Sequence, residues 1–297
     1  MERNRRVLQP EKPSDRLMAA WRQHDRRWND HRFVYAVISR RSRGVSVGVN
    51  LSPEKACNFN CVYCQVDRRV HSSTSHVDLP MLAEELDRIL RAERSGELYE
   101  AAPFDVLTPG ERDVRDIAFS GDGEPTMYSG FAEAVRIAVS AHRKYDLKNT
   151  KLVLITNAAC LDKLSIRSAL TVMDENGGEI WAKLDAGTES YFREVNRSHT
   201  PFDRILENIL NTAVLRPVVI QSLWMRLHGE APPEREIESY STRLNDILAA
   251  GGRLKMVQLH TVIRNPAERY ITPLAREELE QIHDFIKSRV DVPVEIY

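Results

Sequence analysis

The residues with the most distinctive chemistry lie in the stretch CNFNCVYC, where Cys57, Cys61 and Cys64 fall within eight positions. The chain has 297 residues and four cysteines, so three of the four share one short segment. Three thiols cannot pair among themselves, and a chain of this length is not a small scaffold held together by disulfides. The cluster is therefore interpreted as a metal site.

The number of available ligands indicates which metal. A tetrahedral zinc site needs four ligands, but the only nearby candidates for a fourth are His71 and His76, and Cys160 lies far along the chain. Three thiolates with one open position suit an iron-sulfur cubane better, because three irons are held and the fourth can take a ligand or substrate. Structural zinc, in a nucleic-acid-binding protein, is the non-enzymatic alternative.

Short apolar runs separated by helix-like stretches fill the chain from Val45 onward. They predict six strands, at 45–51, 116–120, 151–156, 179–185, 217–225 and 254–262. The intervening and following segments predict helices at 80–94, 130–143, 161–173, 202–213, 234–249 and 275–289. This alternation is typical of an α/β fold with a parallel sheet and right-handed crossovers. Six units are too few for an eight-stranded barrel, so the sheet is an open doubly wound one or an incomplete barrel.

Polar residues inside the predicted strands favour the incomplete barrel. In 179–185 the two-residue period places Trp181, Lys183 and Asp185 on one face. A parallel strand covered by helices on both faces should carry neither a Lys nor an Asp. The pattern recurs in two other predicted strands, with Gln258 and His260 in one, and Ser46, Gly48 and Asn50 in the other. One face of the sheet is therefore expected to line a ligand-filled interior.

The first 44 residues differ from the rest of the chain. They carry twelve Arg and Lys against five Asp and Glu, an excess of seven positive charges, and residues 14–30 have the spacing of an amphipathic helix that includes Trp21 and Trp28. We predict a basic N-terminal helical extension over 1–44 and a core domain over 45–297. A solvated helical arm explains the charge, and a phosphate-binding patch is the alternative.

Composition limits the setting of the protein. The formal net charge is −1, so no global field indicates a nucleic-acid or membrane partner. The N-terminus has no apolar segment typical of a secretory signal, and no run of about 18 apolar residues occurs. A cytoplasmic location, where thiols stay reduced, is expected.

The cysteine stretch resembles the Cys-x3-Cys-x-aromatic-Cys signature of the radical S-adenosylmethionine (radical SAM) superfamily. Members of that superfamily bind a [4Fe-4S] cluster through three cysteines inside a partial (β/α)6 barrel. The resemblance implies this fold with an N-terminal helical extension, Cys57, Cys61 and Cys64 as cluster ligands, and S-adenosylmethionine (SAM) as the second cofactor. It also implies that Tyr63 lies against the adenine of SAM.

A second resemblance follows the predicted strand 116–120. Relatives usually show Gly-Gly-Glu-Pro there, and this chain has Gly121, Asp122, Gly123 and Glu124 before a proline. The resemblance implies that this turn receives the methionine ammonium of SAM. The inserted aspartate leaves open whether Asp122 or Glu124 approaches that group more closely.

Weaker correspondences lie at the ends of the next two predicted strands. Asn157 stands where relatives often have Thr-Asn-Gly, and Asp185 stands where members commonly place a polar residue on the ribose hydroxyls. A salt bridge between Asp185 and Lys183 is the competing interpretation. His260 is interpreted as a histidine satisfied by hydrogen bonds at a strand end, with a proton donor as the alternative. Cys160 is predicted to be a small buried apolar residue.

The implied reaction is a reductive cleavage. An electron from a flavodoxin or ferredoxin would enter the cluster and split SAM into methionine and a 5′-deoxyadenosyl radical, which abstracts hydrogen from the substrate. The stretch around the cysteines looks closest to the iron-sulfur oxidoreductases related to wyosine synthetases, which modify a tRNA base. Those enzymes hold a second cluster through cysteines ahead of the barrel, and this chain has none before Cys57.

Three substrate classes therefore remain. A tRNA base would give the basic residues Arg40, Arg41 and Arg43 a role on phosphates. A glycyl-radical enzyme would need a docking surface for its own loop. A small metabolite would need only the interior, where the candidate contacts are Lys183, Gln221, Gln258 and His260.

Overall fold

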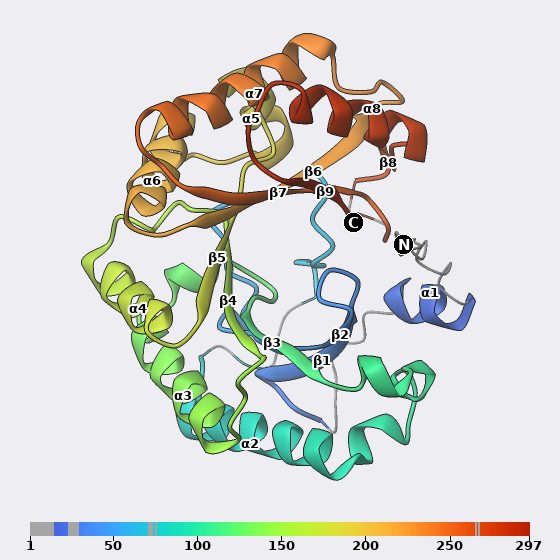
Figure 1. The fold of residues 1–297 in the computed structure, drawn as a ribbon, viewed down its shortest axis with the longest axis vertical. Coiled ribbons are helices and arrows are strands. Elements are labelled where there is room, and N and C mark those ends of the chain that lie inside the picture. Colours follow the sequence, from blue (N-terminus) through green and yellow to red (C-terminus); the bar gives the residue numbers. More distant parts are fainter. Residues whose placement is uncertain (1–14, 23–29, 71–73, 75, 265, 267) are drawn as a thin grey trace, which may run out of the picture.

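A curved sheet of nine strands, with helices on its outer side, forms the framework of the protein (Figure 1). The computed structural model describes residues 15–22, 30–70, 74, 76–264, 266 and 268–297. The strands form an arc around a central space, and the arc is open on the side where α1 and the C-terminus lie (Figure 1). The predicted incomplete barrel is confirmed.

The strands follow the chain in order around the arc. Their order is β1-β2-β3-β4-β5-β6-β7-β9, with β8 paired to β6, and β2 to β7 are parallel. Their bounds are β1 Val34–Ser39, β2 Gly44–Val49, β3 Val114–Phe119, β4 Lys151–Thr156, β5 Gly178–Lys183, β6 Val218–Leu227, β7 Leu254–Thr261, β8 Ile271–Pro273 and β9 Val294–Ile296. Each of the six predicted strands is present within a few residues of its expected bounds.

Most of the helices cover the outer face of the sheet, whereas α1 lies at the open side of the arc (Figure 1). Their bounds are α1 Asp15–Arg22, α2 Leu79–Ser95, α3 Phe131–Lys144, α4 Leu164–Asp174, α5 Glu189–Asn196, α6 Phe202–Leu215, α7 Glu234–Ala249 and α8 Arg276–Lys287. The predicted helix 14–30 corresponds to α1, and its continuation through Trp28 lies outside the described residues. Among the described residues, no helix combines the length and apolar character needed to cross a bilayer.

Four of these strands and helices were not predicted, namely β1, α5, β8 and β9. Strand β1 pairs antiparallel with β2, and its apolar residues lie in a segment where flanking charges dominate the pattern. Helix α5 shares one crossover with α6 and has only eight residues, too few for a clear helical period. Strand β9 is three residues long and joins the sheet beside β7. The division of the chain at residue 44 stays a prediction.

The two faces of the sheet bury different kinds of residue. The outer face packs against the helices in one large apolar core. The inner face holds a small apolar cluster of Ala118, Val153, Trp181 and Val219. Beside it, Glu179 of β5 pairs with Lys151 at 2.8 Å and with Lys255 at 2.7 Å. The interior is therefore filled at this level and hollow nearer the carboxyl ends of the strands.

Strand β1 is held to α2 by one buried carboxylate. Glu85 accepts hydrogen bonds from the backbone N–H groups of Arg32, Phe33 and Val34, at 2.8, 2.8 and 3.0 Å. These groups precede or begin the strand, where the sheet ladder offers them no other acceptor. The contact fixes the first strand of the barrel against its first outer helix.

We expect Glu85→Ala to lower the free energy of unfolding by about 3 kcal/mol, because it leaves buried N–H groups without acceptors. The neighbouring substitution Glu84→Ala removes an exposed pair with Arg88 and should change stability by less than about 0.5 kcal/mol. Urea unfolding of both variants checks the prediction, and equal effects would contradict it.

Candidate functional site

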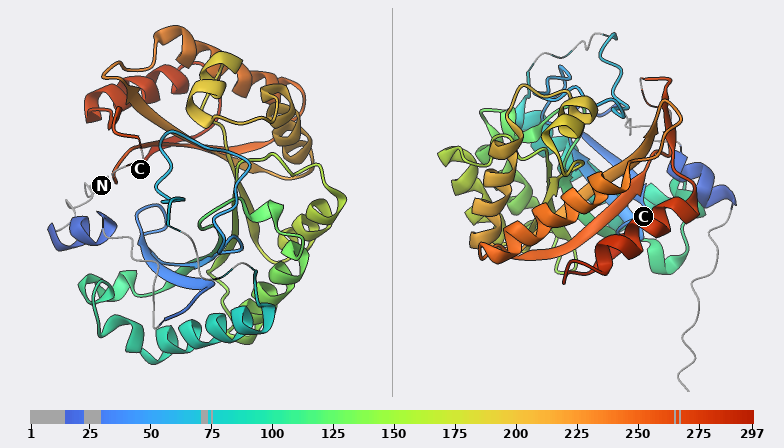
Figure 2. Two further views of the ribbon diagram at one scale, coloured as in Figure 1. Left: turned by 180° about the vertical axis from the view of Figure 1, so that it is seen from behind. Right: turned by 90° about the horizontal axis from the view of Figure 1, so that it is seen from above.

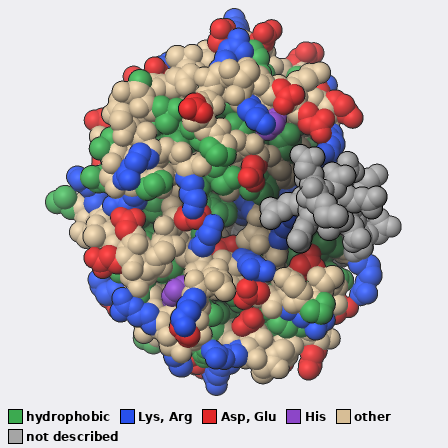
Figure 3. Space-filling view, viewed as in Figure 1, with side chains coloured by type: hydrophobic (Ala, Val, Ile, Leu, Met, Phe, Trp, Pro, Cys, Tyr) green, Lys and Arg blue, Asp and Glu red, His purple; other side chains and the backbone are tan. Residues whose placement is uncertain are grey.

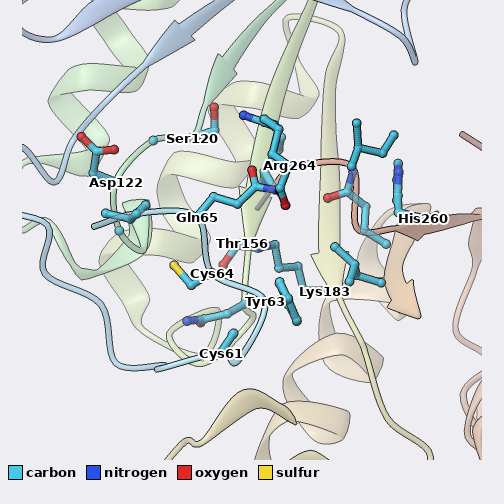
Figure 4. A pocket seen from close by; sticks show the side chains of 18 of the residues that line it. Cys61, Tyr63, Cys64, Gln65, Ser120, Asp122, Thr156, Lys183, His260 and Arg264 are labelled. Carbon is cyan, nitrogen blue, oxygen red and sulfur yellow. The ribbon is translucent and has the colours of Figure 1, made fainter. Parts of the chain in front are cut away.

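The three clustered cysteines lie in the loop that follows β2, at the carboxyl ends of the parallel strands (Figure 2). Cys57, Cys61 and Cys64 are half-buried free thiols. All three line one cavity of about 330 Å³, together with Tyr63 and the turn at 121–124 (Figure 4). The structure thus brings the two main sequence motifs to the same hollow.

The sulfur atoms lie among hydrogen-bond donors. The Phe59 N–H donates to Cys57 Sγ at 3.4 Å, and Asn196 Nδ2 donates to Cys61 Sγ at 3.5 Å. Burial raises the pKa of the Cys57 thiol and raises that of Cys61 to about 11. Both thiols therefore hold their protons at neutral pH, and a bound metal that converts them to thiolates must displace those protons.

The arrangement of the donors fits a cluster better than a single ion. Within the described ranges, no group of three or more His, Cys, Asp and Glu side chains gathers around one ion position. A cubane instead takes its thiolates at separate corners, while a lone zinc needs its ligands around one point. Three free thiols that line one cavity match the first requirement. His71, a predicted zinc ligand, lies outside the described residues.

The turn after β3 packs directly on the cysteine loop. Gly123 lies so close to it that a Cβ atom there would be 1.8 Å from the carbonyl oxygen of Ala56. The N–H of Glu124 donates to the same carbonyl at 3.3 Å. Only glycine allows this approach, so the backbone of the turn supports the loop that carries the thiols.

Asn50 adds a second bridge beside that contact. Its Nδ2 donates to Asp122 Oδ2 at 2.9 Å, while its Oδ1 accepts from the N–H of Asp122 at 3.2 Å and that of Ser52 at 3.1 Å. One buried amide thus joins the end of β2, the cysteine loop and the turn. The two-residue period predicts Asn50 on the inner face, but no pattern in the sequence indicates this bridging role.

Glu124 is buried and engaged by the protein. Its Oε1 accepts from the N–H and hydroxyl of Thr126, at 3.2 and 2.6 Å, and from the hydroxyl of Thr156 at 2.6 Å. Its Oε2 accepts from the N–H of Asn157 at 2.7 Å. Three of these donors share Oε1 and one binds Oε2, so four hydrogen bonds fix the carboxylate and one lone-pair position on Oε2 remains. Glu124 therefore joins the ends of β3 and β4.

Asp185 lies at the end of β5 on the other side of the cavity. Its Oδ1 accepts from the N–H of Leu223 at 2.9 Å, and its Oδ2 accepts from Asn196 Nδ2 at 2.9 Å and from the Tyr63 hydroxyl. Burial, then the charge of Asp185, raises the pKa of Tyr63 well above its ordinary value, so the phenol stays protonated and donates. Asn196 contacts both Asp185 and Cys61, a link that nothing in the sequence pattern indicated.

Lys183 points into the cavity between these groups (Figure 4). Its Nζ lies 5.6 Å from the centre of the Tyr63 ring, and no carboxylate oxygen of the described chain lies within 4.0 Å of it. The competing interpretation of an Asp185–Lys183 salt bridge is therefore wrong. Burial lowers the pKa of Lys183, but the negative charge of Cys61, once that thiol ionises at high pH, and that of Asp185 outweigh burial and raise the pKa of the lysine.

The remaining predicted residues are Asn157, Gln221, Gln258 and Cys160. Asn157 lines the cavity, and its Nδ2 donates to Asn58 Oδ1 at 2.7 Å in the cysteine loop. Gln221 and Gln258 are joined by a 2.9 Å hydrogen bond across β6 and β7. Cys160 is buried away from this cavity, as predicted.

His260 differs from its prediction. Its Nε2 is buried, and no hydrogen-bond partner for it exists in the described part of the chain. The imidazole stacks with Tyr297 at a ring distance of 5.5 Å. Burial, then the charges of Arg41, Arg40 and Lys183, lower its pKa well below the ordinary value. The ring is neutral, and the interpretation of a hydrogen-bonded strand-end histidine is wrong for Nε2.

Comparison with known proteins gives a family match over the centre of the chain. Residues 51–225 match the model of the radical SAM superfamily. The chain is 25% identical over 270 residues to a protein named GTPase Obg from Brachyspira hyodysenteriae, covering 89% of this chain and 35% of that protein. It is 27% identical over 255 residues to UPF0026 protein MJ1312 of Methanocaldococcus jannaschii, covering 84% and 69%. The chain therefore spans between about a third and two thirds of these relatives' lengths.

Solved structures share the fold. SuiB of Streptococcus suis bound to S-adenosylmethionine superposes with a TM-score of 0.55 at 14% identity, covering 86% of this chain and 52% of that one. A structure of TYW1 with a lysine-pyruvate adduct bound superposes with a TM-score of 0.54 at 14% identity, covering 94% and 90%. At these identities the likeness concerns the fold alone.

The contact between Gly123 and Ala56 can be tested with a matched pair of variants. Gly123→Ala should displace the cysteine loop, because the new methyl group meets the Ala56 carbonyl, and should lower the iron bound after reconstitution several-fold. Gly110→Ala adds a methyl group to open space and should leave the iron content unchanged. Equal iron contents in the two variants would contradict the supporting role of the turn.

Proposed function

Because the chain belongs to the radical SAM superfamily, we propose that Cys57, Cys61 and Cys64 bind its [4Fe-4S] cluster and that the adjoining cavity binds SAM. The resemblance noted for the cysteine stretch is confirmed by the family match, and the cluster and SAM are the cofactors of this superfamily. One observation carries the proposal: the three thiols and the turn at 121–124 line the same cavity.

The proposed reaction is the reductive cleavage of SAM. The bound cluster supplies an electron that splits SAM into methionine and a 5′-deoxyadenosyl radical, and this radical takes a hydrogen atom from the substrate. The chain's own part is to hold and orient both cofactors and to keep water away from the reacting atoms. The buried strand ends around Thr156, Asp185 and Ser222 support this role.

We assign the methionine ammonium of SAM to Asp122 and nearby backbone carbonyls, and we give Glu124 a positioning role. The Glu124 carboxylate is buried and already bound by four protein donors, three of them on Oε1, so it is poorly accessible to an ammonium. Asp122 is half-buried and lines the cavity, at the edge of the group of side chains in Figure 4. Binding the methionine ammonium is thus the function that we propose for Asp122, the aspartate between Gly121 and Gly123.

The adenosine half of SAM is proposed to lie between Tyr63 and the ends of β4 and β5. Tyr63 is held in place by its hydroxyl bond to Asp185. Asp185 has three protein donors and one remaining lone-pair position, which a ribose hydroxyl can use. Asn157 is tied to Asn58, so it helps to keep the cysteine loop at the correct distance from the ligand.

A flavodoxin or ferredoxin is the proposed electron donor, in the reducing environment of the cytoplasm. Cys57 also borders a second, outward cavity of about 550 Å³, lined by Asn58, Asn60, Arg197, His199 and Arg204 among others. A donor docked there would approach the cysteine loop from outside without entering the SAM cavity. Arg197 and Arg204 there are paired with Glu268 at 2.6 Å and with Asp162 at 2.7 Å, so an acidic surface of the carrier would exchange for these carboxylates.

The experiment that tests the function measures SAM cleavage. The protein, purified without oxygen and reconstituted with iron and sulfide, is reduced with dithionite in the presence of SAM, and 5′-deoxyadenosine and methionine are quantified. Both products should form in the wild-type protein and fall to background in Cys57→Ala, Cys61→Ala and Cys64→Ala. Cys160→Ala is the matched control and should cleave SAM at the wild-type rate, because Cys160 lies outside the cavity. A wild-type protein that binds iron and sulfide but never forms 5′-deoxyadenosine would refute the proposal.

The two carboxylates of the turn should respond differently to substitution. Asp122→Asn removes a charge at the cavity and should weaken SAM binding about tenfold with little effect on the melting temperature. Glu124→Gln places an amide N–H group against existing donors and should lower the free energy of unfolding by about 2 kcal/mol or more. Equilibrium dialysis with SAM and thermal unfolding separate these effects. Weakened SAM binding in a normally stable Glu124→Gln, with none in Asp122→Asn, would reverse the assignment.

A further inference from the structure

Two arginines reach the cavity from the end of the barrel opposite the cysteines. Arg40 and Arg41 form the turn between β1 and β2, and both line the cavity. Because β1 runs antiparallel to β2, this turn lies at the amino end of β2, whereas the cysteine loop leaves its carboxyl end. The two residues therefore line the part of the cavity farthest from the proposed cluster.

Arg41 is fixed in place by an aromatic ring. Its guanidinium carbon lies 4.9 Å from the centre of the Trp181 ring, on the inner face of β5. Trp181 precedes Asp185 by four residues, which corresponds to about 13 Å along a strand. Lys183 lies between these two levels, closer to the proposed SAM contacts. Arg41 therefore lies at a different depth in the barrel from the residues assigned to SAM.

No anion in the described chain neutralises these cations. Neither the Arg40 nor the Arg41 guanidinium has a carboxylate oxygen within 4.0 Å among the described residues. Asp116 favours the charged form of Arg41 from a greater distance, and its Oδ1 accepts the hydroxyl of Ser46. Burial, then the charge of Arg41, lowers the pKa of Arg40 to about 10, so the Arg40 guanidinium is charged at neutral pH; burial also lowers the pKa of Arg41.

The carboxylates of the cavity do not offset this charge. Glu124 is bonded by four donors and Asp185 by three, at the carboxyl ends of the strands. Two like charges held together and partly removed from water are unfavourable without a counter-ion. His260 adds a buried Nε2 without a hydrogen-bond partner in the described chain, and the charges of both arginines act on its ring. The charges of Arg40 and Arg41 and the Nε2 of His260 therefore indicate that a ligand binds here.

We propose that Arg40 and Arg41 bind an oxyanion of the substrate, a phosphate or a carboxylate group, and that His260 Nε2 makes a hydrogen bond to the same molecule. This inference rests on the proposed function, because it assigns the substrate class of that site. Guanidinium groups suit such oxyanions, since their planar N–H pairs match two oxygens at once. Arg40 and Arg41 hold the charged end of the substrate, and the rest of the substrate extends toward the cysteine loop.

The position of the arginines favours a small molecule over an RNA. If the substrate were a tRNA base, Arg40, Arg41 and Arg43 would be expected to contact its phosphates together. The structure separates them, because Arg40 and Arg41 are half-buried in the cavity while Arg43 is exposed and does not line it. Lys and Arg side chains do gather around the central part of the face in Figure 3, and they offer attraction to an incoming anion.

The test measures the effect of two anions on the melting temperature of the reconstituted protein with saturating SAM. Inorganic phosphate and malonate are titrated separately, with sodium chloride holding the ionic strength constant. We compare wild type, Arg40→Gln and the matched control Arg43→Gln, which removes the same charge from the same turn. Arg41→Lys is included because it keeps the charge but loses the planar fork. The same samples are assayed for 5′-deoxyadenosine, so the proposed function is judged independently.

We expect at least one anion to raise the melting temperature of the wild type and of Arg43→Gln. Its apparent Kd should rise about tenfold or more in Arg40→Gln and to a similar degree in Arg41→Lys. A response to phosphate alone identifies a phosphate ester, and one to malonate alone identifies a carboxylate. In the absence of both anions, Arg40→Gln should melt no lower than the wild type, because it relieves repulsion.

Three results would overturn the inference. The first is no response to either anion, which would include the case in which SAM itself occupies the arginines. The second is an equal response in wild type and Arg40→Gln. The third is an anion-free Arg40→Gln that melts well below the wild type, which would give Arg40 a structural role. In each case, continued SAM cleavage would leave the proposed function intact.

Discussion

The close approach of the turn at 121–124 to the cysteine loop is the constraint on which the site depends. The Ala56 carbonyl lies where a Cβ of residue 123 would be, and it accepts the N–H of Glu124. Glu124 in turn joins the turn to the ends of β3 and β4 through four hydrogen bonds. The thiols, which no strand holds directly, are therefore positioned by the rigid sheet through this contact, together with the links that Asn50, Asn157 and Asn196 make to the same loop.

The interior of the barrel is divided by depth. An apolar cluster and the Glu179 ion pairs fill one level, and the arginines, Lys183 and Gln221 line the next. The cysteines and the turn then close the cavity at the carboxyl ends of the strands. Polar groups persist inside this sheet because the barrel surrounds a ligand cavity, and several of them lack partners within the described chain. These unmet interactions distinguish a binding interior from a packed core.

The sequence predicted the strands of the parallel sheet and the inward face of Trp181, Lys183 and Asp185, because a two-residue period fixes which side chains share a face. It also identified the cysteines and the turn, whose residue types and spacing are distinctive. It did not predict β1, or the links made by Asn50 and Asn196, because these depend on contacts between residues far apart in the chain. The same limit explains the wrong interpretation of His260, whose missing partner is visible only in three dimensions.

The most direct test of the account is the electron paramagnetic resonance spectrum of the reduced, reconstituted protein with and without SAM. The account predicts the signal of a single reduced [4Fe-4S] cluster that changes when SAM is added, because one iron has no cysteine ligand and is open to it. A cluster signal that SAM leaves unchanged, or a colourless protein with one zinc per chain, would contradict the claim that the three cysteines and the adjoining cavity form one SAM-binding site.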